Sequence, residues 1–320
     1  MLVQGKMQTN FSRRRDLDEM ESEGESGGIW QLLKNTGMEW WNDNTFRLAA
    51  SLAFYTIFSL APVLLIAVGI ASFFLARQNA VNKIAAQVQQ LAGAEGAKAV
   101  HQILQSASGI GQGTWAITLG LITLFLGASV VFAELQSALN QIWDVKPAPR
   151  RGVILDYLID RLRSFSIALA VGFLLLVSLA ISAALSGVQD YMTAWLPALP
   201  WLWQVLNNVI SFVLIAALFA AIYKYLPDAV IQWRDVWIGA AVTSFLFTGG
   251  KYLIGLYLGQ TAAGSAFGAA GSLVVLLIWI YYSALISFFG AEFTQVYARR
   301  RGRKIKAKEH ARRAGNKPDA

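Results

Sequence analysis

The chain has no cysteine and carries little charge. The absence of cysteine among its 320 residues excludes disulfides, thiolate metal sites and cysteine nucleophiles. Charged residues make up only 14% of the chain, whereas an average soluble domain carries about 25%. The first 28 residues also lack the apolar stretch of a secretory signal peptide. Any insertion into a membrane is therefore expected to use internal segments.

The chain contains several long apolar segments. Hydrophobic residues make up 56% of the chain, and a helix needs about 20 of them in succession to cross a bilayer. Six segments qualify: Leu48–Leu75, Trp115–Ala133, Phe165–Leu185, Val205–Tyr223, Val236–Leu258 and Leu273–Phe289, the last extending to Tyr297. Six such segments are too many for the core of a soluble protein. We therefore predict an all-α polytopic membrane protein with six transmembrane helices.

The placement of the basic residues predicts the orientation. If six spans put both ends of the chain on one side, 23 of the 27 Lys and Arg residues fall in segments on that side. This asymmetry is the positive-inside pattern. Both termini are therefore expected to be cytoplasmic.

Three parts follow from this topology. Residues 1–27 are rich in charge and are expected to be a disordered cytoplasmic segment. Residues 28–298 form the six-span membrane domain, and residues 299–320 form a basic cytoplasmic tail. The tail is expected to be solvated and to contact anionic head groups.

Nucleic acid is not expected as a partner of the tail because no aromatic residues interleave its charges. Membrane lipids are expected partners, and homo-oligomerisation is left open.

Amphipathic patterns flank the first apolar segment. Residues 28–45 place Ile29, Leu33, Thr36 and Trp40 on one helical face, which predicts a short helix lying in the cytoplasmic interface. Residues 78–108 repeat apolar positions at helical spacing, with an interruption at glycine residues. This pattern predicts two amphipathic helices folded over the outer face.

Lys251 is a cation within the fifth apolar segment. The glycines before it are reminiscent of a phosphate-binding loop, which requires Gly-x-x-x-x-Gly-Lys-Ser/Thr. Phe245 and Tyr252 stand where the first Gly and the hydroxyl residue should be, so this motif is absent. A charge at this depth is costly. Either the long stem lets the ammonium reach the outer head groups, or the side chain faces a cavity and binds an anionic group.

The first apolar segment carries a hydroxyl face. Ser51, Tyr55 and Ser59 recur at helical spacing, and this face is expected to point into the bundle because lipid cannot satisfy hydroxyl groups. Pro62 lies midway along the segment. It removes a backbone donor and clashes with the preceding turn, so we predict a kink or break there.

Two carboxylates and a serine face complete the candidates. Glu134 and Glu292 fall at the cytoplasmic ends of the second and sixth segments. Each is either an interfacial carboxylate beside basic residues or a gating or proton-coupled group. Ser283 and Ser287 share one face of the sixth segment. They either allow tight helix packing or line a polar path.

Four stretches of the chain together resemble one known family. They are AASLAFYTIFSLAPVLL (49–65), ELQSALNQIW (134–143), YKYLPD (223–228) and GSAFGAAGSLVVLLIWIYYSALISFFGAEF (264–293). Their order and spacing resemble the YihY/BrkB family of bacterial inner-membrane proteins over roughly residues 29–300. The resemblance implies a six-helix integral protein of the bacterial inner membrane.

Members of that family have carried the label ribonuclease BN. A zinc-dependent nuclease needs several clustered His and Asp ligands. This chain has two histidines, His101 and His310, and the predicted topology puts them on opposite sides of the membrane. We therefore expect no nuclease activity, no catalytic residues, no metal site and no cofactor.

The leading hypothesis is a transporter or flippase-like protein for an anionic amphiphile or lipid. Its path would lie between the first, third, fifth and sixth spans, with Lys251 meeting the anionic group and Pro62 supplying flexibility. The alternative is a non-transporting scaffold or assembly factor in envelope biogenesis. A hydrophilic groove reached by Lys251 would favour transport, and a tightly packed bundle would favour the scaffold.

Overall fold

The computed structural model describes residues 28–71, 76–108, 130–147, 200–260, 271–303, 305–308 and 311–313, and these are mostly helical. The helices are α2 (Ile29–Asn42), α3 (Thr45–Ala71), α4 (Arg77–Ser108), α7 (Pro200–Tyr225), α8 (Trp233–Gln260) and α10 (Gly271–Arg300), with a further helical stretch at 130–142. The strands are β1 (Val145–Pro147), β2 (Ala229–Val230), β3 (Lys306–Ala307) and β4 (Ala311–Arg313). The third predicted segment, Phe165–Leu185, and most of the second lie outside these residues.

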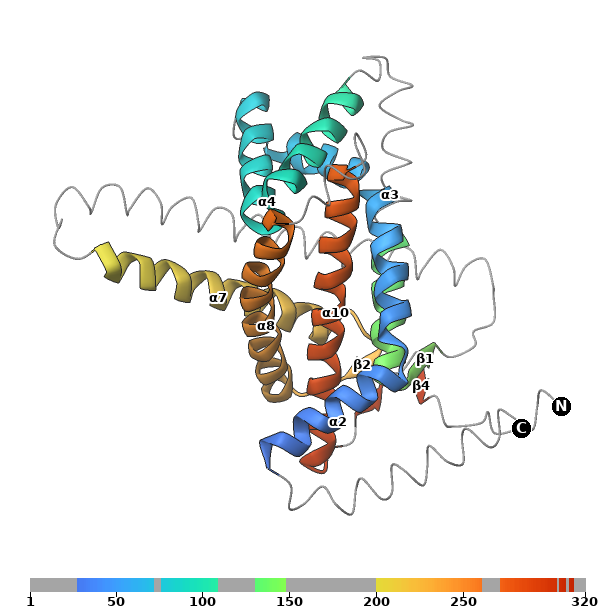
Figure 1. Ribbon diagram of the computed structural model, residues 1–320. Helices are drawn as coiled ribbons and strands as arrows, with labels where there is room; N and C mark the ends of the chain where they lie inside the picture. The colour runs from blue at the N-terminus through green and yellow to red at the C-terminus, as the bar shows by residue number, and fades with distance from the viewer. Residues whose placement is uncertain are drawn as a thin grey trace.

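The central helix of the bundle is α10. It packs against α8, α3, α4 and α2, with α4 at one end and α2 crossing the other (Figure 1). The largest fully buried side chains of the core are Trp143, Tyr223, Phe288, Leu139 and Ile142. Their contacts join the end of helix 130–142 to α7 and α10.

α8 and α10 approach each other through two glycines. A Cβ atom at Gly239 would collide with the side chain of Thr294, and a Cβ atom at Gly290 would collide with the side chain of Thr243. Each threonine lies four residues after the glycine of its own helix, to whose carbonyl its hydroxyl donates a 2.7 Å hydrogen bond. Two Gly-x-x-x-Thr steps therefore interlock. Such small residues let helix backbones come close together, as they do in membrane bundles.

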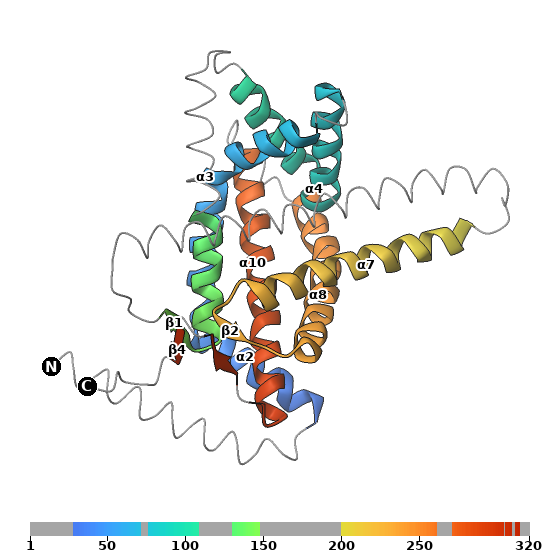
Figure 2. The same ribbon diagram turned by 180° about the vertical axis from the view of Figure 1, so that it is seen from behind.

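α7 lies across α8 and α10 instead of running beside them (Figures 1 and 2). Phe219, Ala220 and Tyr223 in its second half are buried in the core. Val205 and Val209 in its first half are about half exposed. The predicted fourth span is thus a helix, but it does not align with the fifth and sixth.

α4 confirms the prediction of two helices over one end of the bundle. Its backbone leaves the helical region at Gly93, where φ is +75° and ψ is −176°. A positive φ is readily adopted by glycine because it has no Cβ atom. Val100 and Leu104 after the kink pack with Leu64 and Val68 of α3.

α2 confirms the predicted short helix, but of the predicted face only Thr36 is among its buried residues. Leu32, Thr36 and Glu39 are its buried residues, and they lie against α10. Ile29 is 79% exposed, and Leu33 is also exposed. The helix therefore has one side on the bundle and an apolar side free of it, as a helix at a membrane surface would.

α3 stays helical from Thr45 to Ala71, so it runs through Pro62. The last part of the helix, in lighter blue, turns sideways from the line of the first part (Figure 1). The side chain of Pro62 is outside the described part of the chain. Its role as a helix break stays a prediction.

Part of the basic tail is folded, which differs from the expectation of a solvated tail. β3 pairs antiparallel with β2, and β4 pairs antiparallel with β1. The Lys308 amide also donates to the Asp228 carbonyl at 2.9 Å. The sequence does not reveal these pairings because two- and three-residue strands have no readable periodicity. The tail therefore joins the loops that follow helices 130–142 and α7.

Candidate functional site

A cavity of about 180 Å³, partly open to the outside, lies between α3, helix 130–142, α7 and α10. The lining residues are Leu52, Thr56, Val131, Leu135, Leu139, Phe219, Ile222, Tyr223, Ile280, Ser283, Ala284 and Ser287. The predicted serine face of the sixth segment is thus part of this lining. The cavity is mainly apolar, with hydroxyl groups from three helices.

Three of the four hydroxyl groups in the lining donate to backbone carbonyls: those of Tyr223, Thr56 and Ser287. The Tyr223 hydroxyl donates to the Ser287 carbonyl at 2.6 Å and lies 3.0 Å from Thr243 Oγ1. Thr56 donates to the carbonyl of Leu52 at 2.7 Å. Since these three hydroxyls already donate their protons, the cavity suits a mainly apolar group, and the hydroxyls remain able to accept further hydrogen bonds.

Two of the predicted site residues meet beside the cavity. Ser51 Oγ of α3 donates a short hydrogen bond to Glu134 Oε1 of helix 130–142. Ser59 is buried and donates to the Tyr55 carbonyl at 2.8 Å. Tyr55 itself is 38% exposed, beside Phe54 at 5.8 Å between ring centroids. The predicted hydroxyl face is therefore split, with Ser51 and Ser59 turned inward and Tyr55 outward.

Replacing Ser51 by alanine is expected to lower the free energy of unfolding by about 1–2 kcal/mol, because Glu134 loses a donor in a half-buried position. Thermal unfolding of the purified protein in detergent measures this effect. Thr56→Ser is a matched control, since it keeps a hydroxyl on the same helix. An unchanged stability of Ser51→Ala would show that the bond contributes nothing.

Lys251 lies in α8, but its side chain is outside the described part of the chain. None of the described contacts therefore relates it to the cavity or to Glu134. Its two interpretations, snorkelling and binding of an anion, stay open.

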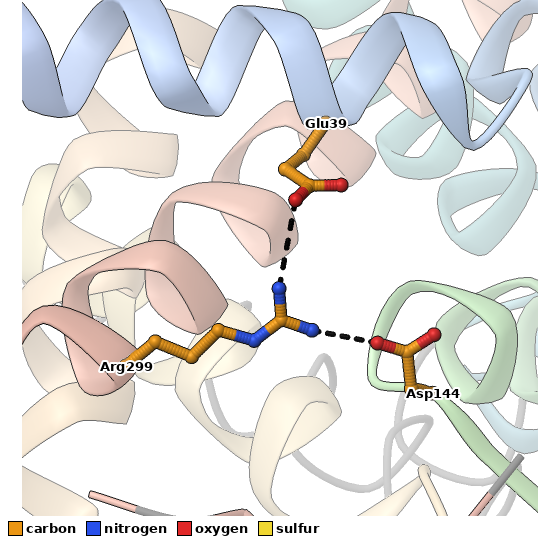
Figure 3. Close-up of polar contacts among 3 residues, drawn as sticks. All are labelled: Glu39, Asp144 and Arg299. Carbon is orange, nitrogen blue, oxygen red and sulfur yellow. Dashed lines mark hydrogen bonds and ion pairs between the residues drawn. The ribbon is translucent and has the colours of Figure 1, made fainter. Parts of the chain in front are cut away.

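Sequence reasoning missed a charged cluster around Arg299, which we name the Arg299 cluster: Glu39, Asp43, Asp144, Glu292 and Arg299. The Arg299 guanidinium bridges two carboxylates, with Nη2 at 2.6 Å from Asp144 Oδ2 and Nη1 at 3.6 Å from Glu39 Oε1 (Figure 3). The three residues come from α10, α2 and the turn after helix 130–142. The sequence signal was weak, because acidic and basic residues near helix ends are usually solvated.

Glu292 is the member of this cluster that the sequence did single out. It is fully buried, whereas an interfacial carboxylate would be partly exposed. Neither of its carboxylate oxygens accepts a hydrogen bond from a described donor. It lies within electrostatic reach of Asp43, Glu39 and Arg299.

The stretches that carry the family resemblance meet in space. Asn140 of ELQSALNQIW donates to Asp228 of YKYLPD at 2.9 Å and accepts from the Asp228 amide at 2.7 Å. Gln136 donates to the same carboxylate at 3.2 Å. These buried polar bonds, and that of Tyr223 to Ser287, join separate stretches into one core. Their residues therefore have a structural role in the bundle.

The outer faces of the bundle expose large apolar side chains. Phe54, Phe58, Phe245 and Leu253 are each 56–71% exposed. Soluble proteins rarely expose so many large apolar groups. Among the described residues, Asn208–Tyr225 and Gly271–Arg300 are long and apolar enough to cross a membrane. A helical fold with such a surface is typical of a helical membrane protein.

Residues 37–315 match the family described as Virulence factor BrkB. Since this match covers most of the chain, the protein belongs to that family, which confirms the resemblance found in the sequence. No solved structure matches the chain.

Relatives support the membrane assignment. A UPF0761 membrane protein of Rhodospirillum centenum is 28% identical over 86% of this chain and 59% of its own length. One of Ralstonia nicotianae is 27% identical over 78% of this chain and 54% of its own length. One of Vibrio vulnificus is 25% identical over 79% of this chain and 77% of its own length. The chain thus spans a little over half the length of the first two relatives.

Proposed function

We propose that the protein is a six-span transporter or flippase-like protein of the bacterial inner membrane, with an anionic amphiphile or lipid as substrate and with both termini cytoplasmic. The observation that carries the proposal is the cavity between α3, helix 130–142, α7 and α10. A mainly apolar cavity between the helices of a membrane bundle suits part of an acyl chain. The proposal assigns no catalytic step, no metal and no cofactor to the chain.

The size of the cavity bears on the mechanism. Sites for small molecules usually measure about 300–1,000 Å³, and this cavity measures about 180 Å³. A whole lipid would therefore require the bundle to open. The bend in α3 is a candidate for that movement, because a proline within a helix removes a backbone hydrogen bond.

Transport is tested in liposomes that contain the purified protein, with fluorescent anionic lipid as the probe. Ser283→Phe is expected to reduce movement about tenfold or more, because the ring would fill the cavity. Leu277→Phe on the exposed side of α10 is the matched control.

Lys251→Ala is expected to slow the movement of an anionic lipid more than that of a zwitterionic lipid. No lipid movement in wild type would contradict the proposal, and equal movement in Lys251→Ala would remove Lys251 from the mechanism.

A scaffold or assembly factor in envelope biogenesis is the second candidate. It is favoured by the interlocked contact of Gly239 and Gly290 with threonines and by the ion pairs of Arg299. These contacts favour a tightly packed bundle whose helices keep one arrangement. If the wild type moves no lipid, this candidate becomes the better one.

A further inference from the structure

Glu292 is buried without a described hydrogen-bond donor, and this needs a physical explanation. Glu292 has no exposed surface, and no described donor forms a hydrogen bond with either of its carboxylate oxygens. An ionised carboxylate in the interior loses the water that solvates it, and a group without compensation becomes neutral instead. The surroundings of Glu292 therefore have to supply either a positive charge or a proton.

The positive charge nearby is already engaged. Arg299 lies within electrostatic reach of Glu292, but its guanidinium binds Asp144 at 2.6 Å and Glu39 at 3.6 Å. The Arg299 cluster thus has four carboxyl groups and one guanidinium. α8, which also packs on α10, contributes Asp235, and this residue is paired with Arg303.

The neighbour that decides the chemistry is Asp43, in the turn between α2 and α3. Its carboxyl group is within hydrogen-bonding range of Glu292. Two ionised carboxylates have no donor between them, so a hydrogen bond between them requires a proton on one. A metal ion fits less well, because among the described residues no group of acidic or histidine side chains could hold one, and Arg299 would repel it.

We propose that Glu292 and Asp43 form a proton-binding site, in which the two carboxyl groups share one proton at the junction of α2 and α10. Loss of the proton leaves two like charges side by side and weakens the contact between these helices. The site does not depend on the transport proposal, since it concerns proton binding by the folded protein alone.

Infrared spectroscopy of the full-length protein in detergent tests the site directly. At about pH 7, where exposed carboxyl groups are ionised, the wild type is expected to show the carbonyl stretch of a protonated carboxyl group. Glu292→Gln and Asp43→Asn are each expected to lose it. Glu134→Gln, whose carboxylate accepts a bond from Ser51, is expected to keep it. A band that is absent from wild type, or that survives Glu292→Gln, overturns the proposal.

The pH dependence of stability is the second measurement. Above about pH 4.3 an exposed glutamate has lost its proton, so the folded protein holds one proton more than the unfolded chain. Its stability therefore falls as pH rises above about 5, until the site has lost its proton. Glu292→Gln, which cannot titrate, is expected to have a flatter profile than wild type. Equal slopes, or a stability that follows sodium or potassium concentration instead of pH, would overturn the proposal.

Discussion

Replacing Gly290 by alanine is expected to lower the free energy of unfolding by about 3 kcal/mol, as overpacking of a close contact does. The new Cβ atom would collide with the Thr243 hydroxyl, and it would lie 2.8 Å from the Tyr223 hydroxyl and 2.9 Å from Thr243 Cβ. α10 would have to move away from α8. Denaturant titration of the purified protein in mixed micelles measures the change.

Gly249→Ala is the matched control for that prediction. Gly249 lies in α8, and a Cβ atom there would meet nothing within 4 Å. Alanine is favoured over glycine inside a helix by roughly 0.5–1 kcal/mol. The control is therefore expected to be neutral or more stable than wild type. If both variants had the same stability, close packing at Gly290 would not be what holds the two helices together.

Replacing Arg299 by alanine is expected to cost about 2 kcal/mol, the scale of a charge-assisted hydrogen bond. Arg299 joins α10 to α2 through Glu39 and to the end of helix 130–142 through Asp144 (Figure 3). Its loss leaves those carboxylates close to Glu292 with no cation between them. The loss is no larger than this because the Arg299 side chain is 31% exposed, so water screens part of the interaction.

Thermal unfolding of Arg299→Ala and of a second arginine variant tests this. Arg234→Ala is the control, since Arg234 is exposed at the start of α8. The control is expected to unfold within a degree or two of wild type, as exposed substitutions usually do. Raising the salt concentration is expected to shrink the difference between Arg299→Ala and wild type. A loss equal to that of the control would show that the cluster adds no stability.

Apolar patterns predicted the parts of the fold that depend on local sequence. The break in α4 at Gly93 and the helices α3, α7, α8 and α10 agree with the segments read from the sequence. Each depends on hydrophobic spacing or on a backbone preference, and both are readable over a few turns. Membership of the BrkB family was likewise readable, because its stretches keep their order along the chain.

The candidate site was readable only in part. Ser51, Glu134, Ser283 and Ser287 were singled out, and the structure brings them to the cavity or beside it. The outward position of Tyr55 was not foreseen. A helical wheel gives the face of a helix, but it does not show how far neighbouring helices extend around that face.

By itself the sequence determined that the chain is a helical membrane protein and where the apolar helices α3, α7, α8 and α10 lie, since both follow from composition and short-range periodicity. Only the tertiary structure decided that Arg299 bridges Glu39 and Asp144, that Glu292 is buried beside Asp43, and that the basic tail pairs with distant loops. These contacts join residues from about 80 to 260 positions apart. Charge complementarity and backbone pairing across such separations leave no periodic signal, so they appear only once the helices are packed.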